Sequence, residues 1–272
     1  MCFDEKIAVV TGGASGIGRA LCQELARRNT TVIVSDIDSE GADRVSAAII
    51  AAGGKADALC LDVSQAEAVE NLVEHVVTTY GRLDYMFNNA GIGIAGDVRD
   101  MELEDWQHIV DVNLWGVIHG TMSAYRVMAK QGFGHIVNTA SGGGLIPMPM
   151  GVAYATTKFG VVGLSTSLRA EAAGLGVRVS VVCPGGVRTN IVETVKLLKM
   201  DREKLVSRIP KRLLMDADKC AKIVLRGVAR NKGIITVTAF ERLGWWLYRF
   251  QPTVYGLLAR TVAQGVRGLL ER

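Results

Sequence analysis

Short runs of β-branched and other apolar residues alternate along this chain with longer segments in which apolar residues recur every three or four positions. The short runs predict buried strands, and the longer segments predict amphipathic helices. The predicted strands cover residues 6–10, 31–35, 56–61, 83–87, 135–139, 177–182 and 234–237. The predicted helices cover residues 17–28, 39–52, 65–80, 154–173 and 216–230, with a helical pair over 104–131.

Strands that alternate with helices through short connections form parallel pairs with right-handed crossovers. We therefore expect an α/β fold with a doubly wound parallel seven-stranded sheet and helices on both faces. No linker rich in Pro, Gly or Ser divides the chain, which predicts one domain. In such a sheet, ligands bind at the carboxyl ends of the strands.

Two amphipathic segments follow the last predicted strand. The first has an apolar stripe of Leu243, Trp246, Leu247 and Phe250. The second, over residues 254–269, has apolar positions at similar spacing, so both predict helices. We expect this extension to pack on the core or on a second subunit. Its tryptophans and arginines would also suit peripheral contact with a membrane, which is the less favoured interpretation.

The composition is that of a folded globular protein, with 272 residues, 49% hydrophobic and 21% charged. Five cysteines lie far apart without a C-x-x-C pair, and the first six residues lack the pattern of a secretory signal. We therefore expect a cytoplasmic protein without disulfides. The four histidines are not spaced as metal ligands are, so we assign them no metal or catalytic role: His75, His108, His119 and His135.

The charge is unevenly distributed. Residues 1–195 carry 14 basic against 21 acidic side chains, a net −7, whereas residues 196–272 carry 17 against 6, a net +11. A basic segment at residues 196–272 could bind nucleic acid, an anionic membrane or an acidic substrate. Because the charges are scattered, ordinary solvated helix faces are favoured and no nucleic-acid partner is expected.

A glycine-rich turn follows the first predicted strand and leads into a helix: Thr11-Gly12-Gly13-Ala14-Ser15-Gly16-Ile17-Gly18. Glycines let the backbone approach a pyrophosphate, and the free N–H groups of the helix start face the anion. Asp36 ends the next strand about 20 residues further on, where a carboxylate can accept hydrogen bonds from an adenosine ribose. The combination predicts a dinucleotide site.

Asp36 also bears on the choice of cofactor. A carboxylate accepts hydrogen bonds from free ribose hydroxyls and repels a 2′-phosphate. Positions 15 and 37 are Ser15 and Ile37, so neither carries a positive charge that could offset this repulsion. NAD is therefore favoured over NADP.

The T-G-x-x-x-G-x-G spacing of this turn resembles that of the short-chain dehydrogenase/reductase family. Further matches follow in order: Asp62-Val63, Asn88-Asn89-Ala90-Gly91, Asn113, Ser141, Tyr154-Ala155-Thr156-Thr157-Lys158 and Pro184-Gly185-Gly186-Val187-Arg188-Thr189. The resemblance covers about residues 4–238. It implies a Rossmann-type NAD-binding catalytic domain over residues 1–240, extended by the helical segment 241–272.

Tyr154 and Lys158 lie four residues apart on a predicted helix and therefore on one face. A nearby ammonium stabilises a phenolate, which would move the tyrosine pKa toward the working range for proton transfer to or from an alcohol oxygen. In the family, the lysine also binds the nicotinamide ribose, the serine holds the substrate oxygen, and the asparagine supports a water in the proton relay. The resemblance assigns these roles to Lys158, Ser141 and Asn113.

The resemblance also assigns the cofactor contacts. These would come from Gly12, Ser15, Gly16, Ile17, Gly18, Asp36, Asp62, Val63, Asn89, Tyr154, Lys158, Val187 and Thr189. Asp62 and Val63 would flank the adenine, and Val187 and Thr189 the nicotinamide carboxamide.

Each catalytic candidate also has an ordinary structural explanation. Tyr154 could be a half-buried aromatic, Lys158 a solvated helix residue, Ser141 a turn former and Asn113 a buried polar bridge. Because the four occur together in the family's order, we favour the catalytic interpretation.

Residues 189–214 occupy the position of the family's substrate lid and are rich in apolar side chains. This composition favours a lipophilic secondary alcohol or ketone, such as a steroid, terpenoid, long-chain or aromatic carbinol, although the same side chains could pack the lid on the core. Met148 and Met150, on the loop before Tyr154, would form an adaptable substrate wall or simply fill gaps.

The sequence thus predicts an NAD-dependent oxidoreductase that transfers a hydride between nicotinamide and an alcohol or ketone. The alternatives are an NADPH-dependent carbonyl reductase and a non-catalytic dinucleotide-binding sensor or scaffold. By resemblance, the long middle helices would form a homodimer or homotetramer.

Overall fold

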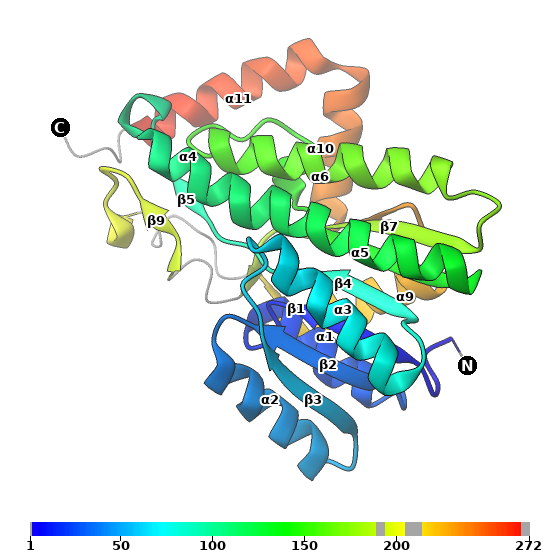
Figure 1. The fold of residues 1–272 in the computed structure, drawn as a ribbon. Coiled ribbons are helices and arrows are strands. Elements are labelled where there is room, and N and C mark those ends of the chain that lie inside the picture. Colours follow the sequence, from blue (N-terminus) through cyan, green and yellow to red (C-terminus); the bar gives the residue numbers. More distant parts are fainter. Residues whose placement is uncertain (1, 189–193, 205–213, 268–272) are drawn as a thin grey trace.

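The computed structural model describes residues 2–188, 194–204 and 214–267. Its main sheet has seven parallel strands in the order β11-β7-β6-β4-β1-β2-β3 (Figure 1). Their bounds are β1 (Ile7–Thr11), β2 (Thr31–Asp36), β3 (Lys55–Cys60), β4 (Tyr85–Asn88), β6 (Gly134–Thr139), β7 (Val177–Cys183) and β11 (Ile234–Thr236). The predicted fold class is confirmed.

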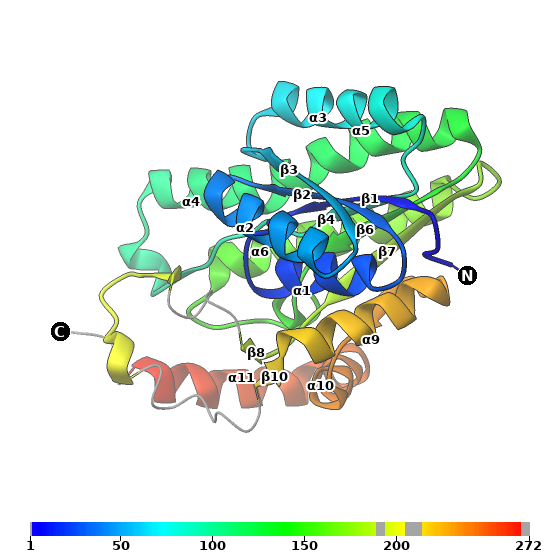
Figure 2. The same cartoon turned by 90° about the horizontal axis from the view of Figure 1, so that it is seen from below.

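Helices cover both faces of this sheet (Figure 2). One face packs against α1 (Gly16–Ala26), α2 (Ser39–Ala51) and α9 (Ala217–Ala229). The other packs against α3 (Ala66–Tyr80), α5 (Gly116–Gln131) and α6 (Val152–Glu171). In β1, Ala8 and Val10 belong to the first face and Ile7 and Val9 to the second. A strand buried on both sides is apolar throughout, which is why these runs show no polar alternation.

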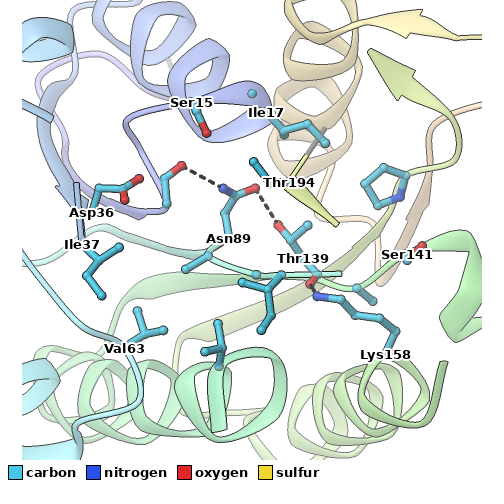
Figure 3. Close-up of a pocket in the computed structure, with 18 of the residues that line it drawn as sticks. Ser15, Ile17, Asp36, Ile37, Val63, Asn89, Thr139, Ser141, Lys158 and Thr194 are labelled. Carbon is cyan, nitrogen blue, oxygen red and sulfur yellow. Dashed lines mark hydrogen bonds between the residues drawn. The ribbon is translucent and has the colours of Figure 1, made fainter. Parts of the chain in front are cut away.

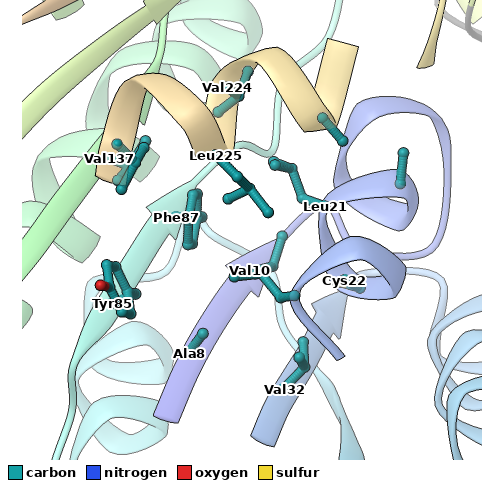
Figure 4. Close-up of a cluster of buried hydrophobic side chains, with 14 of the residues drawn as sticks. Ala8, Val10, Leu21, Cys22, Val32, Tyr85, Phe87, Val137, Val224 and Leu225 are labelled. Carbon is teal, nitrogen blue, oxygen red and sulfur yellow. The ribbon is translucent and has the colours of Figure 1, made fainter. Parts of the chain in front are cut away.

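The core between α1, α9 and the sheet holds the first strand and its turn in place (Figure 4). Leu21 of α1 and Leu225 of α9 are fully buried there with Val10 and Phe87. Burying a leucine side chain contributes about 2 kcal/mol relative to exposing it. The packing therefore fixes the start of α1 relative to the strand ends.

Polar side chains link the middle of the sheet to the helices above it. The Asn88 Nδ2 donates to Asn138 Oδ1 at 2.8 Å, and the Asn138 Nδ2 donates to the Ser165 Oγ of α6 at 3.0 Å. Thr121 of α5 donates to the same Asn138 Oδ1 at 3.2 Å. Because these groups are buried, breaking one bond would leave its partner unsatisfied.

Several elements differ from the sequence prediction. The helical pair predicted over 104–131 is α4 (Leu103–Val110), a π-helical turn η2 (Asp111–Trp115) and α5, which follow one another without a break. Two small parallel sheets were not predicted, because strands of two residues carry no periodic signal. They pair β5 (Ile94–Ala95) with β9 (Lys196–Leu197), and β8 (Val187–Arg188) with β10 (Met215–Asp216).

The C-terminal extension forms two helices, α10 (Ala239–Phe250) and α11 (Pro252–Arg267), as predicted. Of the expected placements, on the core or on a second subunit, the core is met by the side of α10 that carries Trp245 and not by the apolar stripe. Leu243, Trp246 and Phe250 are exposed, because α10 contacts the core through Glu241 and Trp245 on its other side. No helix in the described ranges is long and apolar enough to cross a membrane.

His135 of β6 is a buried titratable group in the centre of the sheet. Its Nε2 lies 2.8 Å from the Ser180 Oγ. Burial, together with the charges of Arg178 and Arg169, lowers the pKa of His135 from 6.5 to about 3. The folded protein therefore keeps this imidazole neutral where the unfolded chain protonates it.

Acid should destabilise the fold through His135. Because the folded pKa lies below the unfolded one, stability falls as pH drops below 6.5. Between pH 7 and pH 5 the loss from this residue should be about 2 kcal/mol. Urea unfolding at a series of pH values should show it in the wild type and not in His135→Gln. The matched control, His75→Gln on the exposed face of α3, should keep the wild-type slope.

Candidate active site

A cavity of about 650 Å³ opens at the carboxyl ends of the strands. The strand order reverses between β1 and β4, because β1 continues to β2 on one side while β4 lies on the other. Such a switch point leaves a crevice between the two strand ends, which is the usual ligand site of a doubly wound sheet. Figure 3 shows Ser15 and Asp36 toward one end of this cavity and Ser141 and Lys158 toward the other.

The glycine-rich turn makes close approaches that only glycine allows. Gly12 has a φ of +66°, and a Cβ there would lie 2.8 Å from the Cα of Ala90. A Cβ on Gly18 would clash with the carbonyl oxygen of Gly12. These glycines therefore let β1, α1 and the segment after β4 meet at the cavity floor.

The start of α1 fits an anion. Gly12, Ser15, Gly16 and Ile17 line the cavity. Ser15 occupies the N-cap position, yet its side chain forms no cap hydrogen bond with α1. The first N–H groups of a helix need partners, and the helix dipole favours negative charge there. The uncapped turn thus suits the pyrophosphate that the sequence predicts.

Asp36 lies at the end of β2, on the wall of the cavity. The backbone N–H of Ala14 donates to its Oδ2 at 2.9 Å, and that of Asp38 donates to its Oδ1 at 3.1 Å. These bonds tie the carboxylate to the glycine turn. Each oxygen keeps a further lone pair that a ribose hydroxyl could use.

Asn89 connects three segments of the site. Its Nδ2 donates to the carbonyl oxygen of Thr11 at 3.1 Å, and Thr139 donates to its Oδ1 at 3.4 Å. The Thr11 Oγ in turn accepts the backbone N–H groups of Asn89 and Ala90 at 3.0 and 3.1 Å. The asparagine therefore both lines the cavity and fixes its floor.

Asp62, Val63 and Val187, predicted as cofactor contacts, also lie on the cavity wall. The Asp62 Oδ1 accepts from the backbone and the hydroxyl of Ser64, at 2.9 and 2.7 Å, so this carboxylate stabilises its own turn. Thr189 lies outside the described residues. Gly18 acts through the close approach to Gly12 and is not a wall residue.

Lys158 is buried in α6, and its Nζ donates to the carbonyl oxygen of Thr139 at 3.1 Å. The Nζ lies 5.6 Å from the centre of the Tyr154 ring. Burial lowers the pKa of Lys158 from 10.5 to about 8. The structural alternative of a solvated lysine is therefore wrong.

Tyr154 and Ser141 lie together at the end of the cavity. The Ser141 Oγ accepts the backbone N–H of Gly143 at 3.1 Å and hydrogen-bonds to Tyr154. Burial raises the pKa of Tyr154, whereas the Ser141 hydrogen bond lowers it by a smaller amount. The expected net lowering of this pKa by Lys158 is wrong for this state of the protein, because desolvation of the phenolate dominates.

Asn113 lies within the π-helical turn, behind Gly91 rather than on the cavity wall. Its Oδ1 accepts the backbone N–H of Ile92 at 2.8 Å, and its Nδ2 donates to the Ile92 carbonyl at 2.9 Å. The side chain is fully buried, and its Nδ2 also donates to the Thr157 Oγ of α6 at 3.5 Å. A π-turn loosens the backbone hydrogen-bond pattern of a helix and often marks a functional site.

The described part of the lid packs against the body of the protein. Leu198 lies against Gly96 and belongs to the apolar cluster that contains Ile92 and Tyr154. The Lys196 Nζ lies 2.6 Å from the Asp105 Oδ1. Core packing therefore accounts for the apolar character of this part of the lid, and the remaining lid residues lie outside the described ranges.

Sequence reasoning missed several wall residues. His108, set aside in the sequence analysis, lines the cavity. The others are Ile37, Asp38, Leu61, Ile92, Val112, Thr139, Ala140 and Thr194, together with Ala90, Gly91, Pro184 and Gly185, which belong to the matched motifs but were given no contact. Many of them directly follow a strand, so the rule that ligands bind at strand ends could have found them. No cluster of three potential metal ligands occurs within the described ranges.

Comparison with known proteins agrees with this geometry. Residues 6–198 match the family model of the short chain dehydrogenases. The chain is 36% identical to the 3-oxoacyl-(acyl-carrier-protein) reductase FabG of Thermotoga maritima over 225 residues, covering 83% of this chain and 91% of that protein. It is 38% identical to a cyclohexanol dehydrogenase of an Acinetobacter strain over 191 residues, covering 70% and 76%.

Among solved structures, a short chain dehydrogenase/reductase of Burkholderia phymatum in complex with NAD superposes with a TM-score of 0.85. It is 28% identical, and the match covers 93% of this chain and 96% of that one. The chain therefore belongs to the short-chain dehydrogenase/reductase family. It is an oxidoreductase with a Rossmann-type nucleotide-binding fold.

Burying Lys158 should cost stability in a pH-dependent way. Because its folded pKa lies below the unfolded one, the cost is complete below pH 8 and disappears as the pH rises toward 10.5. We expect Lys158→Met to be more stable than the wild type near neutrality, with the difference shrinking by about 2–3 kcal/mol between pH 7 and pH 10. Urea unfolding of both proteins measures this difference. Lys222→Met, at an exposed position of α9, should show no such trend.

Proposed function

We propose that this oxidoreductase transfers a hydride between NAD and a lipophilic secondary alcohol or ketone. The observation that carries the proposal is the arrangement of the cavity. An uncapped helix start and Asp36 lie in the same cavity as Tyr154, Ser141 and Lys158. A dinucleotide held at one end could thus reach a proton-transfer pair at the other.

In this proposal, the bound nicotinamide cofactor supplies or accepts the hydride. The Tyr154 hydroxyl gives a proton to the carbonyl oxygen during reduction and becomes the phenolate, and in oxidation the phenolate takes the proton of the alcohol and becomes the hydroxyl again. Ser141 hydrogen-bonds to the same oxygen and positions it. Lys158 binds the nicotinamide ribose, and its ammonium stabilises the Tyr154 phenolate once that forms. Asn113 acts indirectly, by holding Ile92 and the π-helical turn in place for a proton relay.

The preference for NAD rests on Asp36. The carboxylate faces the cavity beside the helix start, where it would accept ribose hydroxyls and repel a 2′-phosphate. The neighbouring wall residues Ser15, Ile37 and Asp38 bring no positive charge. An NADPH-dependent carbonyl reductase is the alternative within the same family.

The lipophilic substrate is supported by the surroundings of Tyr154. Its ring belongs to an apolar cluster with Ile92, Met101, Trp106 and Leu198. The name of the Acinetobacter relative specifies cyclohexanol, a secondary alcohol, and that of the Thermotoga relative specifies a 3-oxoacyl group. Both are ketone or alcohol substrates with hydrocarbon parts.

We also propose a cytoplasmic homodimer or homotetramer formed through the long middle helices. Large apolar side chains are exposed on the π-turn, α5 and α6: Trp115, Met122, Val152 and Phe159. Contiguous apolar surface on a soluble protein often marks an interface. The cytoplasm is a reducing compartment, and the five cysteines of this chain, none of which forms a disulfide, are consistent with it.

Tyr154→Phe tests the reaction. Because the phenol exchanges the proton, we expect kcat for alcohol oxidation with NAD to fall by about 100- to 10,000-fold, with NAD binding retained. For the wild type, kcat/KM should rise from neutral to alkaline pH, since burial raises the pKa of the base. NADH formation on a panel of secondary alcohols, beginning with cyclohexanol, gives both values. Tyr80→Phe is the remote control.

Full turnover by Tyr154→Phe would contradict the mechanism. NAD binding without turnover on any alcohol or ketone of the panel would instead favour the sensor or scaffold.

Asp36→Asn tests the cofactor preference. Loss of the charge should lower kcat/KM for NAD about tenfold or more, because hydrogen bonds to a charged group contribute about 1.5–3 kcal/mol. The ratio of NADP to NAD activity should rise. Asp38→Asn removes an equal charge from the same wall and keeps an N-cap residue on α2, so it should leave the ratio close to that of the wild type. A wild-type enzyme that prefers NADP would overturn the proposal.

A further inference from the structure

The outward side of α10 is an apolar surface. Phe240, Leu243, Trp246 and Phe250 recur every three or four residues, and between 57 and 81% of each is exposed. A surface helix normally buries its apolar stripe and shows polar residues to solvent. In α10 the apolar stripe faces solvent instead. The helix is nevertheless regular, with 12 residues and an N-terminal cap from Thr238.

The inward side of α10 accounts for this orientation. Glu241 is buried against Gly142 and Gly185, where it completes the capping box with Thr238. Trp245 packs on the cluster formed by α5, α6 and the segment after Ser141. The inward side is therefore fixed, and the apolar stripe is left for another surface.

Helix α11, which packs against α10, also exposes apolar side chains. On its inward side, the Tyr255 hydroxyl donates to the Pro147 carbonyl at 3.4 Å, and its ring lies 5.3 Å from that of Tyr248. On its exposed side, Val254, Leu257 and Leu258 are each between 45 and 58% exposed. We call these three residues and the four exposed apolar residues of α10 the tail surface.

The charged side chains that α10 and the described part of α11 expose are arginines. Between residues 242 and 270 the sequence contains four arginines and no aspartate or glutamate. Arg242 and Arg249 are exposed on α10, each about one turn from Trp246 along the helix, and Arg260 is exposed on α11. Within the ranges that the structure describes, none of these three forms an ion pair with an acidic side chain.

This charge distribution distinguishes between two possible occupants. A symmetric dimer through the tail surface would bring the same patch of each copy together. The acid of α10, Glu241, is buried against Gly142 and Gly185, so the exposed arginines of one copy would find no exposed acid on these helices of the other, and like charges oppose association. An anionic lipid surface pairs with the arginines and also takes up the aromatic and aliphatic side chains.

We propose that α10 and α11 dock this protein on the surface of an anionic lipid bilayer. The two helices lie along the interface, with the tail surface among the acyl chains and the arginines at the headgroups. The docked helices contact the loop between Ser141 and Tyr154 through Ile146 and Pro147. The docking does not depend on which reaction the cavity carries out.

Sedimentation of the full chain with lipid vesicles tests the proposal. We expect binding to vesicles of phosphatidylcholine mixed with phosphatidylglycerol, weaker binding to phosphatidylcholine alone, and release as the salt concentration rises. The double variant Leu243→Glu/Phe250→Glu should lose about tenfold or more of its affinity. The matched control, Ile50→Glu/Leu103→Glu, changes two exposed aliphatic residues outside the extension and should bind like the wild type.

A second variant keeps the test decisive if the first fails to fold. Arg242→Gln/Arg249→Gln leaves the apolar stripe intact and should selectively weaken binding to the anionic vesicles. Trp246 fluorescence should shift to the blue on docking, and Trp246→Phe should remove that shift. Thermal unfolding of each variant verifies that it is folded.

Absence of binding to anionic vesicles would overturn the proposal. In that case, dissociation of an oligomer by Leu243→Glu/Phe250→Glu in size-exclusion chromatography with light scattering would identify the tail surface as a subunit interface. Equal vesicle binding by Leu243→Glu/Phe250→Glu and by its control, Ile50→Glu/Leu103→Glu, would also contradict the proposal.

Discussion

The close approach of three backbone segments at the switch point is the constraint on which the rest of the site depends. The Gly12 turn meets Ala90 across a distance that a side chain could not tolerate. Asn89 and Thr11 then hold the two segments together by hydrogen bonds. Because Leu21 and Leu225 pack the adjoining helices behind this contact, the uncapped start of α1 stays aimed into the cavity.

Burial is the second determinant of the site, and it acts against the proposed chemistry in the isolated protein. Desolvation raises the pKa of Tyr154 and lowers that of Lys158 to about 8, so each group is pushed toward its neutral form. A polar ligand that solvates the lysine would oppose this shift. Strongly shifted pKa values of neighbouring groups in one cavity are typical of a proton-transfer site.

The parts of the fold that the sequence predicted share one property, a long and regular pattern. The inner strands of the sheet are buried on both sides and the helices between the strands on one side. Their apolar residues therefore recur at a regular spacing that the sequence alone reveals. The two small sheets at β5 and β8 lack such a pattern, since their pairing depends on residues about 100 and 30 positions away along the chain. The π-turn at Asn113 is likewise fixed by a partner, Ile92, on another segment.

The candidate residues show the same division. Chain order, residue type and the resemblance to the family predicted Asp36, Ser141, Tyr154 and Lys158 as site residues, and the structure brings the four to one cavity. The tertiary structure decided the state of these groups, since a pKa depends on burial and on neighbours that spacing does not reveal. It also decided the orientation of the C-terminal helices. Their amphipathic pattern was clear from the sequence, but Glu241 and Trp245 determined which side meets the core, and so left the apolar side in solvent.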